Sequence, residues 1–147
     1  MKTPEEYKAS LKAMRKNVYK FGELIDDVTT HPATRRTVEG HAQIFEAALK
    51  EEYKDLLTTE SSITGKRVVR YLSLIRSAED MINNVKMKRL MFNLTGTCTG
   101  GRCAGFNGFN AMWAATYDMD QAMGTDYHQR LKAWLKGAQE NDITLSG

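Results

Sequence analysis

The sequence predicts an all-α fold, a single helical domain of five or six helices. Apolar residues recur at steps of three and four along most of the chain, which is the spacing of helices with one buried face. No segment alternates strictly between apolar and polar residues, and only two prolines occur in 147 residues. No repeat or internal boundary divides the chain, so we expect one domain over residues 1–147.

The first helix is expected from Pro4 to about Tyr19. Thr3 is suited to cap it, proline fits its first turn, and Glu6 completes a capping box. Gly22 is expected to end it. Its buried side is expected to hold Tyr7, Leu11 and Met14.

A second helix is expected over residues 33–57, after the break at His31-Pro32. Residues 58–65 indicate a polar loop, and residues 68–74 are expected to form a short helix rather than a strand. The apolar stripe of the second helix consists of Ile44, Phe45, Ala48, Leu49, Tyr53, Leu56 and Leu57.

The next helix is expected to begin at Ser77, because Asp80 follows it three residues later, and to end near Leu94. A glycine-rich loop is then expected over residues 95–101. The buried residues of this helix are expected to be Met81, Ile82, Val85, Leu90 and Met91.

A further helix is expected from about Cys103, with Gly124 ending it. Asp126 is expected to cap the last helix, and residues 141–147 are expected to form a linker-like tail. The inward residues of these two helices are expected to be Phe109, Met112, Trp113, Thr116, Met119, Met123, Leu131, Trp134, Leu135 and Ala138.

Charge and hydropathy argue against nucleic acid and membrane partners. The net charge is +3, and the 21 basic and 18 acidic residues are interspersed. We interpret the densest basic groups, Arg35-Arg36 and Lys86 with Lys88-Arg89, as solvated helix faces, with a patch near an anionic cofactor tail as the alternative. No apolar run approaches the length of about 18 residues needed to span a membrane, and no secretory signal opens the chain. We therefore expect a cytoplasmic protein.

The two cysteines, Cys98 and Cys103, flank a glycine pair where a loop is expected to enter a helix. Unpaired amide groups at a helix start favour thiolate, the form that binds metal or acts as a nucleophile, and Arg102 adds a positive charge. Inert thiols, a redox disulfide and a metal site all remain open, and two ligands fill only half of a zinc or iron–sulfur site. The three histidines, His31, His41 and His128, are expected to have structural or surface roles.

Several short motifs together resemble the flavoprotein family that contains 4-hydroxybutyryl-CoA dehydratase and 4-hydroxyphenylacetate 3-hydroxylase. The resemblance covers essentially the whole chain, and Arg102-Cys103-Ala104-Gly105 is its most specific part. The other motifs are Asn17–Glu23 with His31-Pro32, Leu57–Thr59 with Gly65-Lys66, Lys86–Leu90, Phe109–Ala111, Gly124–His128 and Gln139–Asp142.

The cysteine pair resembles that of the dehydratase branch, which also isomerises vinylacetyl-CoA. This resemblance implies an acyl-CoA-dehydrogenase-like N-terminal domain, an acyl-CoA substrate, FAD and a [4Fe–4S] cluster with Cys98 and Cys103 as two of its ligands. It also implies that Arg102 and Phe106 lie at the cofactor or substrate site. The chain departs from the family's pattern, with four residues instead of three between the cysteines, in a stretch whose glycines accept unusual dihedral angles.

The resemblance further implies that flavin contacts, acid–base residues and the remaining cluster ligands lie in domains beyond this chain. We expect either a truncated enzyme or one subunit of a split, oligomeric enzyme, inactive as this chain alone. Two alternatives remain, a flavin-dependent aromatic hydroxylase component without a cluster and a non-catalytic helical assembly subunit.

Overall fold

The computed structural model describes residues 1–96 and 100–144, and for residues 100–104 it describes the backbone alone. Within these residues the chain forms six α-helices, two antiparallel sheets of two strands each and one 3-10 helix, η1. This confirms the predicted all-α class and number of helices. No helix in the described part is long and apolar enough to cross a bilayer. The elements are α1 (Pro4–Ala13), β1 (Tyr19–Lys20), β2 (Glu23–Leu24), α2 (Arg35–Leu49), α3 (Glu51–Leu57), β3 (Thr58–Glu60), β4 (Arg67–Val69), η1 (Arg70–Leu72), α4 (Ala78–Thr95), α5 (Gly100–Met123) and α6 (Tyr127–Glu140).

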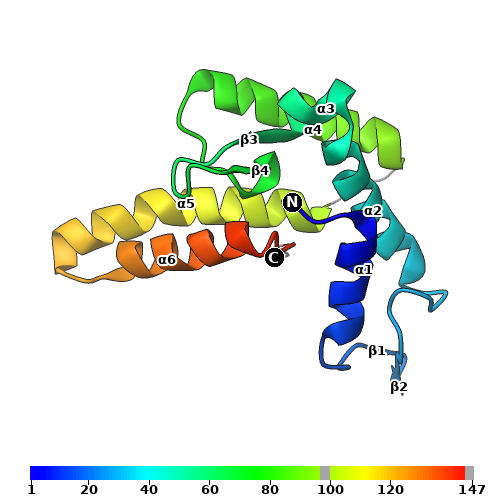
Figure 1. The fold of residues 1–147 in the computed structure, drawn as a ribbon. Helices are drawn as coiled ribbons and strands as arrows, with labels where there is room; N and C mark the ends of the chain where they lie inside the picture. The colour runs from blue at the N-terminus through cyan, green and yellow to red at the C-terminus, as the bar shows by residue number, and fades with distance from the viewer. Residues whose placement is uncertain (97–99, 145–147) are drawn as a thin grey trace.

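Two helical pairs form the ends of the molecule (Figure 1). α5 and α6 run antiparallel as the longer pair, and α1 packs against α2 at the opposite end. α3 and α4 lie above α5 in this view, with β3, β4 and η1 between them and the α5–α6 pair. The termini are close together, because the backbone N–H of Lys2 donates to Asp142 at 2.8 Å.

The predicted capping box opens α1. The N–H of Glu6 donates to the hydroxyl of Thr3 at 3.1 Å, and the N–H of Thr3 donates to the Glu6 carboxylate at 2.8 Å. The helix ends at Ala13 and not near residue 19, because Met14 already has extended backbone angles. Met14 is 63% exposed, so its predicted burial was wrong.

Gly22 lies in the turn between β1 and β2 instead of ending α1. Its φ of +87° and that of Phe21, +52°, give the tight turn that two such short strands need. The N–H of Ile25 donates to the carbonyl of Val18 at 2.8 Å, and Ile25 is buried. Pairing and burial of this segment therefore outweigh continuation of the helix.

The helix expected over residues 33–57 is divided into α2 and α3 at Lys50, whose ψ of 130° is extended. The residues after α3 form a β-hairpin in place of the predicted loop and helix. Thr58 pairs with Val69, and Glu60 pairs with Arg67. Only Arg70–Leu72 of the expected short helix is helical.

Asp120, near the end of α5, organises the start of α6. Its carboxylate accepts hydrogen bonds from the Thr125 hydroxyl at 2.6 Å and from the N–H groups of Tyr127 and His128, each at 2.9 Å. The Thr125 hydroxyl is the main reason that the pKa of Asp120 lies below its ordinary value of 3.8. The side chain of Asp126, the predicted cap, makes no capping hydrogen bond.

The main core lies where α2, α3, α4, η1, α5 and α6 meet. Its buried residues are Ile44, Ala47, Ala48, Leu57, Val69, Tyr71, Met87, Met91, Phe106, Phe109, Leu135 and Ala138. A second cluster, made by Tyr7, Val38, Ala42 and Phe45, joins α1 to α2.

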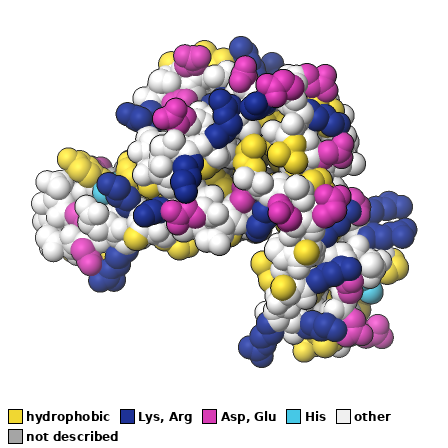
Figure 2. Space-filling model, in the orientation of Figure 1, with side chains coloured by type: hydrophobic (Ala, Val, Ile, Leu, Met, Phe, Trp, Pro, Cys, Tyr) yellow, Lys and Arg dark blue, Asp and Glu magenta, His cyan; other side chains and the backbone are white. Residues whose placement is uncertain are grey.

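Periodicity predicted too many inward residues, because several helices have a second apolar face that no described element covers. Figure 2 shows hydrophobic surface open to solvent on one face of the molecule. The residues predicted inward but at least 40% exposed are Met14, Leu49, Met81, Ile82, Val85, Met112, Met119, Met123 and Trp134.

Candidate functional site at the start of helix α5

The cysteine motif lies at the junction of α4 and α5. α4 ends in Gly96, whose φ of +65° is left-handed and whose N–H donates to the carbonyl of Phe92 at 2.9 Å. α5 begins at Gly100, three residues before Cys103, where we expected the helix to start. Cys98 lies outside the described residues, whereas the backbone of Cys103 is in the first turn of α5.

Arg102 also belongs to the first turn of α5, where the structure describes the backbone alone. Phe106 follows one turn later and is 1% exposed. Its ring packs edge-on against Phe109 at a centroid distance of 5.6 Å, and the ammonium of Lys88 lies 6.0 Å from its centroid. Phe106 is therefore a core residue of this chain, and its role at a ligand site stays a prediction.

Asn110 holds this part of α5 against the segment that follows η1. Its side-chain oxygen accepts from the N–H of Ile75 at 2.8 Å. Its side-chain nitrogen donates to the carbonyls of Phe106 at 2.9 Å and Ser73 at 3.3 Å. These bonds and the aromatic packing fix the helix that carries the cysteine motif.

A [4Fe–4S] cluster takes four protein ligands, and cysteine thiolates are the usual ones. Cys103 lies in the first turn of a long helix, where the positive end of the helix dipole favours thiolate. In the described part of the chain no group of three or more His, Cys, Asp or Glu side chains is placed to hold a metal ion. By residue type, the two cysteines could supply at most two of the four ligands, so the other two would have to come from elsewhere.

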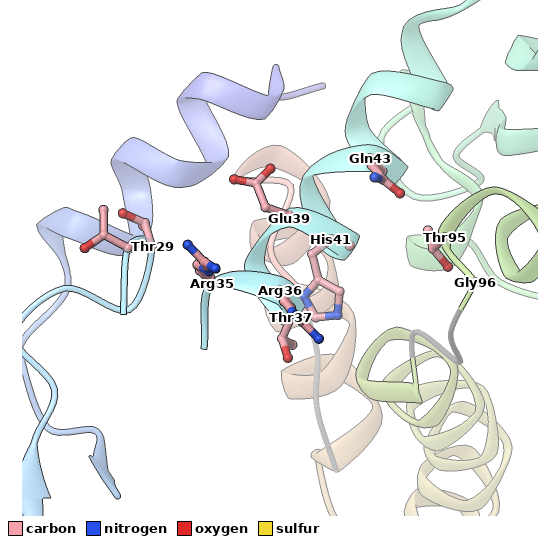
Figure 3. A pocket seen from close by; sticks show the side chains of 11 residues that line it. Thr29, Arg35, Arg36, Thr37, Glu39, His41, Gln43, Thr95 and Gly96 are labelled. Atoms are coloured by element: carbon pink, nitrogen blue, oxygen red, sulfur yellow. The ribbon is translucent and has the colours of Figure 1, made fainter. Parts of the chain in front are cut away.

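A cleft of about 950 Å³ lies beside this junction (Figure 3). One wall is the first half of α2, with Arg35, Arg36 and His41, and another contains Thr95 and Gly96 at the end of α4. Sequence reasoning identified Arg35 and Arg36 only as a dense basic group. The approach of α2 to the end of α4 could not be derived from local patterns, because it is a tertiary contact.

The histidines make structural contacts. Nδ1 of His31 accepts from the N–H of Ala33 at 3.1 Å, and the phenol of Tyr7 lies 3.2 Å from Nδ1 of His41. The ring of His128 packs edge-on against Trp113 at 4.4 Å. These contacts support the structural roles predicted for them.

Comparison with known proteins identifies the family. The family described as 4-hydroxyphenylacetate 3-hydroxylase N terminal matches residues 3–147. The chain belongs to this family. Within it, the 4-hydroxybutyryl-CoA dehydratase/vinylacetyl-CoA-Delta-isomerase of Clostridium aminobutyricum is 39% identical over 145 residues, which are 99% of this chain and 29% of the relative. The oxygenase component of 4-hydroxyphenylacetate 3-monooxygenase from Escherichia coli is 36% identical over 80 residues, 54% of this chain and 15% of the relative.

Solved structures of the family show the same fold. An oxygen-tolerant archaeal 4-hydroxybutyryl-CoA dehydratase from N. maritimus matches with a TM-score of 0.90 and 35% identity over 97% of this chain. The oxygenase component of 4-hydroxyphenylacetate 3-monooxygenase complexed with FAD matches with a TM-score of 0.69 at 20% identity, a likeness of fold alone. The chain spans 28% of the archaeal structure and 29% of the Clostridium relative, so it corresponds to less than a third of their length.

Proposed function

We propose that this chain is the N-terminal helical domain, or a split subunit, of an FAD- and [4Fe–4S]-dependent enzyme like 4-hydroxybutyryl-CoA dehydratase/vinylacetyl-CoA isomerase. In this proposal Cys98 and Cys103 are two ligands of the cluster, and Arg102 and Phe106 lie near the cofactors. The observation that carries it is the 39% identity with the Clostridium dehydratase across 99% of this chain. Identity to the E. coli hydroxylase component covers only 54% of it.

The local structure is consistent with a ligand role. The start of α5 brings free N–H groups close to Cys103, which lowers the cost of a thiolate. Phe106 and Phe109 anchor the following turns in the core, so the first turn is held by a rigid support. When bound, the cluster would supply a Lewis acid and FAD would supply electron-transfer chemistry. This chain's part is to hold and orient the ligands.

The rest of such an enzyme would bind the apolar faces that this chain leaves open. Met81, Ile82 and Val85 form one such face on α4, and each is at least 45% exposed. Met123 at the end of α5 and Trp134 on α6 are further exposed residues. We propose that the remaining domains, in cis or as a partner subunit in a cytoplasmic oligomer, cover these faces, that acyl-CoA binds to the assembly, and that the isolated chain is inactive.

A hydroxylase-like component without a cluster is the second candidate, and the likeness of fold to the FAD complex of that enzyme favours it. The two candidates predict different iron contents, because only the dehydratase-like enzyme would hold a cluster. A non-catalytic assembly subunit would instead bind a partner that has a complete active site of its own.

The test is anaerobic purification of the tagged chain from its native host, with iron, sulfide and flavin measured on the intact assembly. We expect flavin and about four irons per cluster, and loss of the iron in both Cys98→Ser and Cys103→Ser. Ala115→Ser is the matched control, because it places the same side chain at an exposed position of α5. Flavin without iron would favour the hydroxylase candidate, and full iron in both cysteine variants would refute the ligand assignment.

A further inference from the structure

We propose that the cleft between α2 and the end of α4 binds a phosphate-bearing group through Arg35 and Arg36. The cleft has a volume of about 950 Å³, which suits a nucleotide-sized ligand. Both arginines lie on its α2 wall (Figure 3). Guanidinium groups bind phosphate through two parallel hydrogen bonds, and because both side chains line the same cleft they could each bind one phosphate of a bisphosphate or pyrophosphate.

The side chains around the cleft leave a net positive charge at Arg35 and Arg36, which favours binding of an anion. Neither side chain has an ion pair or hydrogen bond within the described residues, and both are exposed. Glu39 is the acidic residue among the described lining residues, and its carboxylate already binds the ammonium of Lys8 at 2.8 Å. An incoming phosphate would therefore meet two unpaired cations and a carboxylate that is already paired.

The backbone at the start of α2 has the same preference. Its first turn carries no acidic residue, and Thr34 at its cap accepts no side-chain hydrogen bond. The Thr34 hydroxyl instead donates to the carbonyl of Val28 at 2.6 Å. Two cations at the positive end of a helix repel that end, and a bound anion removes the repulsion.

The end of α4, on the opposite wall of the cleft, should disfavour an anion close to it. α4 ends at Thr95 and Gly96, so the negative end of its dipole faces the cleft. An anion is therefore expected against α2, leaving the space beside Gly96 for a less charged part of the ligand.

Two sources supply this chemistry, the phosphorylated adenosine of coenzyme A and the pyrophosphate of FAD. The choice between them rests on the proposed function, whereas binding of phosphate to the arginine pair does not. A failure of the iron measurement would leave this site untouched. A failure of phosphate binding would leave the cysteine assignment untouched.

Isothermal titration of the 147-residue chain with pyrophosphate in low salt tests the site. We expect Arg35→Gln/Arg36→Gln to weaken binding by about tenfold or more, and Arg35→Lys/Arg36→Lys to weaken it less, because charge is kept and the planar fork is lost. Lys132→Gln/Lys136→Gln, two exposed changes on α6, lowers the net charge equally and should leave binding unchanged.

The melting temperature of the ligand-free Arg35→Gln/Arg36→Gln variant should not fall, since the substitution removes like charges from the positive end of α2. Tighter binding of adenosine 3′,5′-bisphosphate than of ADP would identify the coenzyme A tail, and the reverse order would identify the flavin nucleotide. Pyrophosphate that fails to bind the unaltered chain, or binds the glutamine variant as tightly, would overturn the proposal.

Discussion

Arg70 joins η1 to the end of α3 by hydrogen bonds from its side chain. It is buried in η1, and its guanidinium donates to the carbonyls of Leu56 at 2.7 Å and of Asp55 and Thr58 at 3.0 Å each. These carbonyls lie at the end of α3, where the helix itself offers no further donors. Burial lowers the pKa of Arg70, and the nearby carboxylate of Asp80 opposes that shift.

We expect Arg70→Met to destabilise the fold by about 3 to 5 kcal/mol. Hydrogen bonds from a charged donor contribute about 1.5 to 3 kcal/mol each, and three of them are lost, but water can reach part of the freed carbonyls. For a urea dependence of about 2 kcal/mol per molar, the unfolding midpoint should fall by about 2 M. Arg70→Lys should recover little, because an ammonium lacks the planar fork that contacts three carbonyls.

Urea unfolding followed by circular dichroism measures this shift. Arg89→Met is the matched control, since Arg89 is exposed on α4 and has no side-chain partner among the described residues. Its substitution should change the free energy of unfolding by less than about 0.5 kcal/mol. If Arg70→Met unfolded within about 1 kcal/mol of the unaltered chain, the assignment of Arg70 as the clamp between α3 and η1 would be incorrect.

Two further predictions concern the other polar contacts between elements. The lowered pKa of Asp120 stabilises the fold above the ordinary value of 3.8, and this contribution is lost as pH falls through the lowered pKa. Asp120→Asn should therefore reduce the fall in melting temperature between pH 6 and pH 3, unlike the exposed Asp118→Asn, and equal slopes would contradict this. Gln139 is buried and joined by hydrogen bonds to Ser61 and to Leu72 in η1. Changing Gln139 to Leu should lower the free energy of unfolding by about 2 to 3 kcal/mol. Ser61→Ala should restore part of that loss in urea unfolding, and full additivity of the two changes would argue against the contact.

The helical elements were largely predictable because their signals are local. The capping box at Thr3 and Glu6, the serine cap at Ser77 and the left-handed Gly124 each act within one turn of chain. The break at Lys50 and the hairpin after α3 were not predictable in this way. They depend on pairing between strands and on Arg70, whose partners lie 12 to 15 residues away.

Part of the candidate site was likewise predictable from local sequence, and part was not. The cysteine motif could be placed at a helix start from sequence, because glycines precede it and a periodic apolar face follows. Burial of Phe106 was not predicted, since the core that contains it also draws residues from other elements, Met87 and Met91 of α4 among them. The cleft at Arg35 likewise needs the end of α4 as its second wall.

The burial pattern of α5 indicates how this domain can serve a larger enzyme. Phe106 and Phe109, near its start, are each 1% exposed, whereas Met123 at its end is 70% exposed. A helix anchored at one end holds its first turn within a fixed geometry and leaves its far end for another surface. Cys103 belongs to the first turn at this anchored end, and Thr95 and Gly96, which precede the motif in the chain, line the cleft with the two arginines. In the proposed assignment of Cys98 and Cys103 as cluster ligands, the core around Phe106 would limit the movement of the helix that carries Cys103, which metal ligation requires.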